Sequence, residues 1–197
     1  MIRKFSPLQI LALLALLLFT AFITWRTKKI ERALAAHDSS ASLRGRAAPN
    51  FSLDSLEGSR VSLAEFRGKK KVVVSYWASW CGPCRVELPE LKQFYEKYHK
   101  KDTDFEVVAI SVDDDRASAE AFAARAKLPF PVLLDLEHNA ADAYSVDAIP
   151  ATFIVDKNGI VNYATTGLEE ALEVRLALQL GVKIENVSKS PNETTSE

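Results

Sequence analysis

A mostly apolar run at 71–77 is followed, after three residues, by Cys-Gly-Pro-Cys at 81–84. This order limits the possible folds more than any other feature of the chain. The run is rich in β-branched and aromatic residues, which favours a buried strand. Apolar residues then recur at helical spacing over 83–100, which predicts a helix. A strand that leads directly into a helix, with both cysteines of the chain at the junction, indicates an α/β domain with a reactive turn.

The two cysteines, Cys81 and Cys84, are too few for the disulfide framework of a small secreted domain. A bridge between them closes a very short loop, so it would stabilise the fold little. At a helix start, free backbone N–H groups and the helix dipole favour the thiolate, which is the nucleophile of thiol–disulfide exchange. Pro83 needs no N–H donor in the first turn, and Gly82 keeps the approach to Cys81 open. We therefore predict that Cys81 is the exposed attacking thiol and that Cys84 is the buried resolving thiol.

The rest of the chain alternates between strand-like and helix-like patterns. We predict an N-terminal hairpin within 50–62 and, further along, a terminal hairpin followed by a helix. Strands that alternate with helices imply helices packed around a mixed central sheet. The predicted strands after 77 are 105–112, 130–135, 151–156 and 160–166, and the predicted helices after 100 are 116–128, 138–146 and 168–180.

The N-terminal segment contains an uncharged apolar run at 8–25. As a helix it would span about 27 Å, which is enough for the hydrocarbon core of a bilayer. The run is longer than the apolar region of a typical signal peptide, so we interpret 1–35 as a retained single-span anchor, with a cleaved signal peptide or a buried helix as alternatives. The domain organisation is then completed by a flexible linker at 36–46, a folded domain at 47–187 and a disordered polar tail at 188–197.

The charge distribution gives two further indications. Basic residues after the apolar run at 26–32 would keep the C-terminal side in the cytoplasm, but long domains cross membranes largely regardless of such charges. The formal net charge is −1, and no basic stripe follows the N-terminal cluster, which argues against nucleic-acid binding.

Two motifs resemble the thioredoxin superfamily. The first is "WCGPC" at 80–84, with a further proline at Pro89, and the second is "DAIPATFIVD" at 147–156. Together with "APNFSLDSLEGSRVSL" and the predicted helix 116–128, they make residues 47–181 similar to the membrane-anchored TlpA/ResA-like family.

This resemblance implies a thioredoxin-like α/β fold, with an N-terminal β-hairpin extension, an inserted helix and one N-terminal transmembrane helix. It also implies a reductant of protein disulfides on the periplasmic or other extracytoplasmic side of a bacterial inner membrane, in some relatives for cytochrome c maturation. A membrane electron-donor protein would recharge it, and no cofactor or metal is required. By the same resemblance the Ile149–Pro150 bond is cis, and the substrate-binding residues are Trp80, Gly82, Pro83, Ile149 and Pro150.

The chain departs from plain thioredoxin at Ser75, where that protein has a buried acid six residues before the first cysteine. A hydroxyl cannot replace a carboxylate as a proton acceptor for Cys84. We therefore consider Asp113 or Asp114, which follow the strand 105–112, as possible acid/base groups. The alternative is that both are solvated carboxylates before the next helix.

Two other classes of function are considered. A copper or zinc carrier on this fold would have only two thiolates, whereas zinc usually takes four ligands, and His99 and His138 are interpreted as surface residues. A peroxiredoxin-like peroxidase is suggested by "APNFSLDSLEGSRVSL", but its Pro-x-x-x-Thr-x-x-Cys loop is absent from 74–81. Thiol–disulfide exchange therefore remains the favoured function.

Overall fold

The computed structural model describes residues 16, 17, 19–24, 26, 39–100 and 104–184. Contacts divide the chain into a unit that ends at Ser39 and a second unit that begins at Ser40. The described residues up to 26 are helical, and their side chains are exposed. Among the described residues, no helix has both the length and the apolar character needed to cross a membrane. Much of the predicted span at 8–25 and the whole predicted tail at 188–197 lie outside the described residues.

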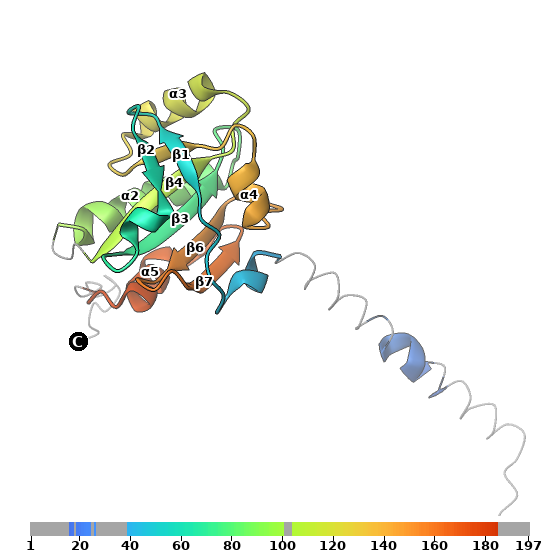
Figure 1. Cartoon of the computed structure of the whole chain (residues 1–197). Coiled ribbons are helices and arrows are strands. Elements are labelled where there is room, and N and C mark those ends of the chain that lie inside the picture. Colours follow the sequence, from blue (N-terminus) through green and yellow to red (C-terminus); the bar gives the residue numbers. More distant parts are fainter. Residues whose placement is uncertain (1–15, 18, 25, 27–38, 101–103, 185–197) are drawn as a thin grey trace, which may run out of the picture. The chain divides into compact units, whose positions relative to one another are not determined.

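The second unit is built on one seven-stranded sheet in the order β2-β1-β5-β4-β3-β6-β7 (Figure 1). Strands β3, β4 and β5 are parallel, whereas β1, β2, β6 and β7 join the sheet by antiparallel pairing. The mixed sheet and the N-terminal hairpin confirm the predicted thioredoxin-like architecture. The strands are β1 (Ser52–Ser55), β2 (Arg60–Ser62), β3 (Lys71–Trp77), β4 (Phe105–Ser111), β5 (Val132–Leu134), β6 (Ala151–Val155) and β7 (Val161–Thr166).

Each face of the sheet has its own hydrophobic core. Helices α2 (Cys84–Tyr98), α3 (Arg116–Ala126) and α5 (Leu172–Leu180) contribute to the core on one face. Helix α4 (Asn139–Ala143) and the 3-10 turns η1 (Ser39–Leu43) and η2 (Leu63–Phe66) contribute to the core on the other. Helix α3 is the predicted insertion between β4 and β5. Helix α5 begins four residues later than the predicted start at 168.

Strand β3 lies inside the sheet, between β4 and β6, and its side chains alternate between the two cores. Val73 and Trp77 belong to the core beneath α2, while Val74 and Tyr76 belong to the core beneath α4. Because side chains alternate along a strand, Ser75 points to the same face as Val73 and Trp77. A buried hydroxyl therefore lies directly beneath the helix that carries Cys84.

The segment 45–48, on either side of the predicted boundary between linker and domain, pairs with the outer edge of the sheet. The N–H groups of Gly45 and Ala48 donate to the carbonyls of Val161 and Gly159, both at 2.8 Å. Ala47 also forms an isolated bridge with Ile160. The folded backbone thus begins earlier than the predicted linker suggested, and it covers part of the free edge of β7, an edge that would otherwise be open to other strands.

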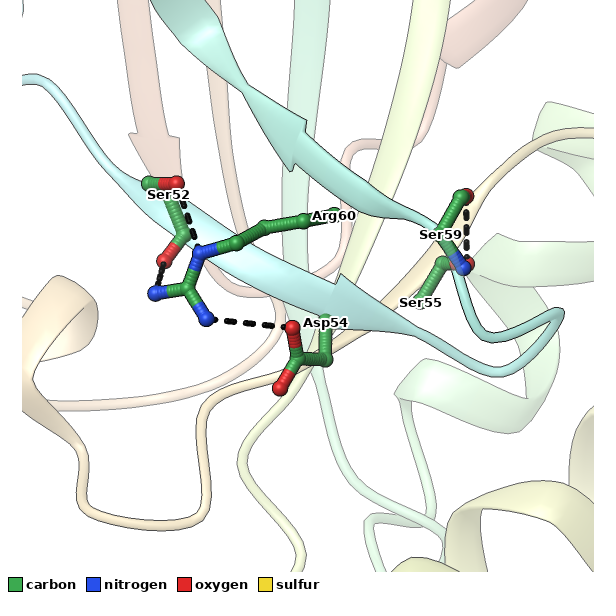
Figure 2. Close-up of polar contacts among 5 residues, drawn as sticks. All are labelled: Ser52, Asp54, Ser55, Ser59 and Arg60. Atoms are coloured by element: carbon green, nitrogen blue, oxygen red, sulfur yellow. Dashed lines mark hydrogen bonds and ion pairs between the residues drawn. The ribbon is translucent and has the colours of Figure 1, made fainter.

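Polar contacts fix the hairpin at the opposite edge (Figure 2). Arg60 of β2 reaches across β1, and its guanidinium donates to the hydroxyl and carbonyl oxygens of Ser52 and to Asp54. The hydroxyls of Ser55 and Ser59 lie 2.9 Å apart at the turn. These contacts hold the register in which Ser52 faces Ser62 and Asp54 faces Arg60.

Candidate active site

Cys81 and Cys84 are joined by a disulfide at the N-terminus of α2. The backbone N–H of Cys84 donates to Cys81 Sγ at 3.2 Å. This N–H belongs to the first turn of the helix, where donors have no partner within the helix. The same donor and the helix dipole would favour a thiolate on Cys81 once the disulfide is reduced.

The two cysteines differ in exposure less than we expected. Cys84 is completely buried, as predicted, but Cys81 is also only 5% exposed. The exposure predicted for Cys81 concerns the attacking thiol of the reduced protein and stays a prediction, because in the disulfide form this cysteine is covered. The reason is the loop before β6, whose Ile149 carbonyl oxygen lies 3.7 Å from Cys81 Sγ. The cysteine that retains some exposure is nevertheless the one assigned as the attacking thiol.

The loop that covers Cys81 has the predicted cis bond between Ile149 and Pro150. Pro150 is buried and Ile149 is partly buried. The carbonyl of Pro150 accepts a 2.7 Å hydrogen bond from Gly167, at the end of β7. This bond brings the segment after β7 next to the loop. Leu168, the residue after Gly167, therefore comes close to the loop that covers Cys81.

Large apolar side chains remain exposed around the cysteines. Trp80, directly before Cys81, is 65% exposed, and Val86 and Leu168 are about half exposed. Gly82 and Pro83 are exposed in the turn itself. Exposed aromatic and aliphatic side chains beside a reactive group offer contact area to a partner protein. Four of the predicted substrate-binding residues, Trp80, Gly82, Pro83 and Ile149, are at least partly accessible.

The two candidate acid/base residues are in different surroundings. Asp114 is exposed, whereas Asp113 is 1% exposed and accepts hydrogen bonds from Ser79 and Ser111. Ser79 is the residue before Trp80. The geometry of Asp113 is that of an anchor for the loop that leads into the cysteines. The acid/base role of either aspartate remains a prediction.

The structure reveals a buried carboxylate that the sequence reasoning missed. Glu87 lies three residues after Cys84 on α2 and is 1% exposed. Its Oε1 accepts hydrogen bonds from Ser75 at 3.2 Å and Thr152 at 3.0 Å, while its buried Oε2 has no partner among the described residues. Burial raises the pKa of Glu87, the hydrogen bonds from Thr152 and Ser75 lower it, and the charges of Glu90 and Glu169 raise it, so that the pKa is about 7. A buried carboxyl with a pKa near neutral pH, one helical turn from a buried cysteine, is suited to proton transfer once the disulfide is reduced.

Two signals in the sequence could have identified Glu87. Ser75 interrupts an otherwise apolar central strand, and Cys84, Glu87, Leu88 and Leu91 fall at helical spacing on one face. A charged residue in such a stripe needs a polar partner beneath the helix, and Ser75 supplies one. Among the described residues, no group of three or more His, Cys, Asp or Glu side chains is arranged to hold a metal ion.

The fold and the disulfide at the helix start define the class of the protein. The sequence pattern of the AhpC/TSA family matches residues 44–164, and the chain belongs to that family. Within it, the chain is a ResA/TlpA-like thiol–disulfide oxidoreductase. A thiol-disulfide oxidoreductase ResA of Geobacillus thermodenitrificans (strain NG80-2) is 34% identical over 170 residues, which are 86% of this chain and 90% of that protein.

Solved structures agree with this assignment. A crystal structure described as that of a thiol:disulfide interchange protein DsbE from Chlorobium tepidum matches with a TM-score of 0.63 and 34% identity, over 69% of this chain and 94% of that chain. The crystal structure of StoA from Bacillus subtilis matches with a TM-score of 0.56 and 27% identity, over 65% of this chain and 95% of that chain. The similarity therefore extends over nearly the whole of both solved domains.

Proposed function

We propose that this oxidoreductase reduces protein disulfides through Cys81 and Cys84, with Glu87 as the proton acceptor of the second step. The observation that carries the proposal is the Cys81–Cys84 disulfide at the start of α2, covered by the Ile149 carbonyl at 3.7 Å. It joins an electrophilic sulfur, a helix N-terminus and the backbone of a partly buried loop in one place.

In the first step the reduced protein attacks its substrate. The Cys81 thiolate bonds to one sulfur of the substrate disulfide, the substrate S–S bond breaks, and the departing thiolate takes a proton from water. The N–H of Cys84 stabilises the attacking thiolate. Trp80 and the Ile149 carbonyl provide contacts to an extended substrate segment around its cysteine.

In the second step Cys84 releases the substrate. Its S–H proton passes to Glu87, and the Cys84 sulfur attacks Cys81 Sγ. The bond between Cys81 and the substrate breaks, and the substrate leaves as a thiolate that takes a proton from solvent. The protein is oxidised to its disulfide and the substrate disulfide is reduced to two thiols.

The direction and place of the reaction are also part of this proposal. Gly-Pro between the cysteines is the sequence of thioredoxin, a reductant at about −270 mV, whereas the oxidant DsbA lies at about −120 mV. A single-span anchor at 8–25 would hold the domain on the extracytoplasmic side of the inner membrane, near a membrane electron donor. Cytochrome c maturation would be one use of such a reductase.

The test is reduction of insulin disulfides by the purified full chain, with dithiothreitol as the electron source. Cys81→Ser should abolish catalysis, and Cys84→Ser that has been reduced and then freed of dithiothreitol should remain bound to substrate through Cys81. Unchanged activity in Cys81→Ser would refute the proposal. Peroxide consumption without disulfide reduction would support the peroxidase alternative, and tight metal binding by the reduced chain, again without disulfide reduction, would support the carrier alternative.

A further inference from the structure

Ser75 and Thr152 lie directly opposite each other in neighbouring strands. They are register partners in the antiparallel pair of β3 and β6. Side chains directly opposite in such a pair point to the same face, with Cβ atoms about 4.5–5.5 Å apart. The sheet therefore presents two adjacent hydroxyls to the underside of α2.

Both hydroxyls donate to a single oxygen of Glu87. Ser75 reaches Oε1 at 3.2 Å and Thr152 reaches it at 3.0 Å. A carboxylate has about four lone-pair positions, so these two bonds use the capacity of Oε1 and leave that of Oε2 unused. Oε2 is buried and has no hydrogen-bond partner among the described residues.

Glu87, which carries the unpartnered oxygen, lies on the same helix as Cys84. Glu87 and Cys84 are three residues apart on α2, which puts them on one face of the helix. Glu87 is 1% exposed and Cys84 is 0% exposed, so both side chains lie on the buried side of the helix, against the sheet. A buried carboxylate oxygen without a donor is costly, and a proton is the smallest group that can satisfy it.

We propose that Ser75 and Thr152 are positioning residues, which orient Glu87 so that Oε2 is the atom that accepts the proton of Cys84. This inference rests on the proposed role of Glu87. The proton leaves Cys84, the Cys84 sulfur bonds to Cys81, the bond between Cys81 and the substrate breaks, and the leaving thiolate is protonated by solvent. The hydroxyls keep their protons throughout.

The same hydroxyls favour the ionised carboxylate and so oppose the effect of burial. Burial raises the pKa of Glu87, the bonds from Thr152 and Ser75 lower it, and the neighbouring charges of Glu90 on α2 and Glu169 before α5 raise it. Loss of one hydroxyl removes a charge-assisted hydrogen bond, so the pKa should rise by about one unit. At neutral pH the ionised fraction would then fall about fivefold.

The experiment mixes the reduced full chain with a chromogenic aromatic disulfide in a stopped-flow instrument. The first thiol released reports attack by Cys81, and the second reports resolution by Cys84. The rate of the second release is followed from about pH 5 to pH 9. The variants are Thr152→Val and Ser75→Ala, which lack one hydroxyl each, with Thr152→Ser as the control that keeps it.

The rate of the second release should rise with pH, and its midpoint is the pH at which it reaches half of its maximum. We expect this midpoint to move upward by about one pH unit in Thr152→Val and in Ser75→Ala, and to stay in place in Thr152→Ser. A midpoint that stays in place in both hydroxyl-deletion variants, or that moves equally in Thr152→Val and Thr152→Ser, would overturn the inference. If one variant does not fold, the other carries the test, because each hydroxyl bonds Oε1 separately.

Failure of the proposed function gives a different result. Without thiol–disulfide exchange, the wild-type chain releases no thiol at all. If Glu87 is not the acceptor, Glu87→Gln has the same pH profile as the wild type. If Glu87→Gln changes the profile while both hydroxyl variants keep it, the inference alone is wrong.

Discussion

Asp113 holds Ser79 by its backbone N–H at 3.0 Å and by its hydroxyl at 2.7 Å. The carbonyl of Ser79 is held from the other side, because Arg85 donates to it at 2.9 and 3.0 Å. The residue two positions before Cys81 is thus bonded both to the segment after β4 and to the first turn of α2. These bonds fix the direction in which the chain enters the cysteine turn.

Replacing Asp113 should therefore loosen the turn. In Asp113→Ala the N–H and hydroxyl of Ser79 lose their acceptor, so the free energy of unfolding should fall by about 1–3 kcal/mol. The first thiol release, which reports attack by Cys81, should slow, while the pH midpoint of the second release should stay in place. Urea unfolding and the stopped-flow assay measure the two effects.

Asp114→Ala is the matched control, because Asp114 is exposed. Its stability should stay within about 0.5 kcal/mol of the wild type. A shift in the midpoint of the second release in Asp113→Ala would instead support the acid/base role that the sequence suggested for this residue.

Glu87 should make the stability of the disulfide form depend on pH. Its pKa is raised from 4.5 to about 7, so between these values the folded state holds a proton that the unfolded state has lost. Stability is greatest below the lower value and falls as the pH rises through the upper one. From about pH 5.5 to pH 8, the ionisation of this group alone should lower the free energy of unfolding by about 2 kcal/mol.

Glu87→Gln should remove that part of the pH dependence. Urea unfolding of the oxidised wild type and of the variant at the two pH values measures it. The comparison uses the change with pH and not the absolute stability, because a buried amide has hydrogen-bonding needs of its own. An identical fall in stability in both proteins would show that Glu87 is ionised in the folded state throughout.

Cys84→Ala should trap the substrate. Without the resolving thiol, Cys81 remains in a mixed disulfide, and mass spectrometry of the captured partners would identify the substrates. Cys81→Ala should capture none, since Cys84 is completely buried. Equal capture by the two variants would reverse the assigned roles or make them interchangeable.

Trp80→Ala should affect protein substrates more than small ones. Trp80 is 65% exposed, so its loss should change stability little, but an exposed indole next to Cys81 offers a partner a large contact area. We expect reduction of a protein disulfide to slow about tenfold, which corresponds to a loss of about 1.4 kcal/mol of transition-state stabilisation. Reduction of a small disulfide should slow less. Leu178→Ala, on the exposed side of α5, is a control that should change neither rate.

The parts of the site that lie within one short segment of the chain could be predicted from the sequence. The strand at 71–77, the cysteines at the start of the next helix and the cis bond before β6 are all found as expected. The strand and the helix follow from the pattern of a short stretch of chain, whereas the cis bond was expected from the resemblance of 147–156 to the thioredoxin superfamily. The architecture followed because the strands and helices alternate in order along the chain.

Glu87 was missed because local sequence gives only the helical stripe that contains it, whereas the polar partners that explain its burial are distant residues. Its partners Ser75 and Thr152 are 12 and 65 positions away in the sequence, and they meet only when β3 pairs with β6. The small exposure of Cys81 has the same kind of cause, since Ile149 is 68 positions away. The linker at 36–46 was predicted to be flexible because its residues are mostly small and polar. Leu43 within it is nevertheless buried.

The pairing of 45–48 with β7 also decides where a mechanical load would enter the domain. A pull on the chain from its N-terminal side is resisted by the buried Leu43 and then by the hydrogen bonds of Gly45 and Ala48 to Val161 and Gly159. Strand β7 passes the load to β6, and β6 begins directly after Pro150, so the sheet edge takes up tension one strand away from the loop that covers Cys81. The fold thus separates the point where the chain can be pulled from the point where it exchanges disulfides.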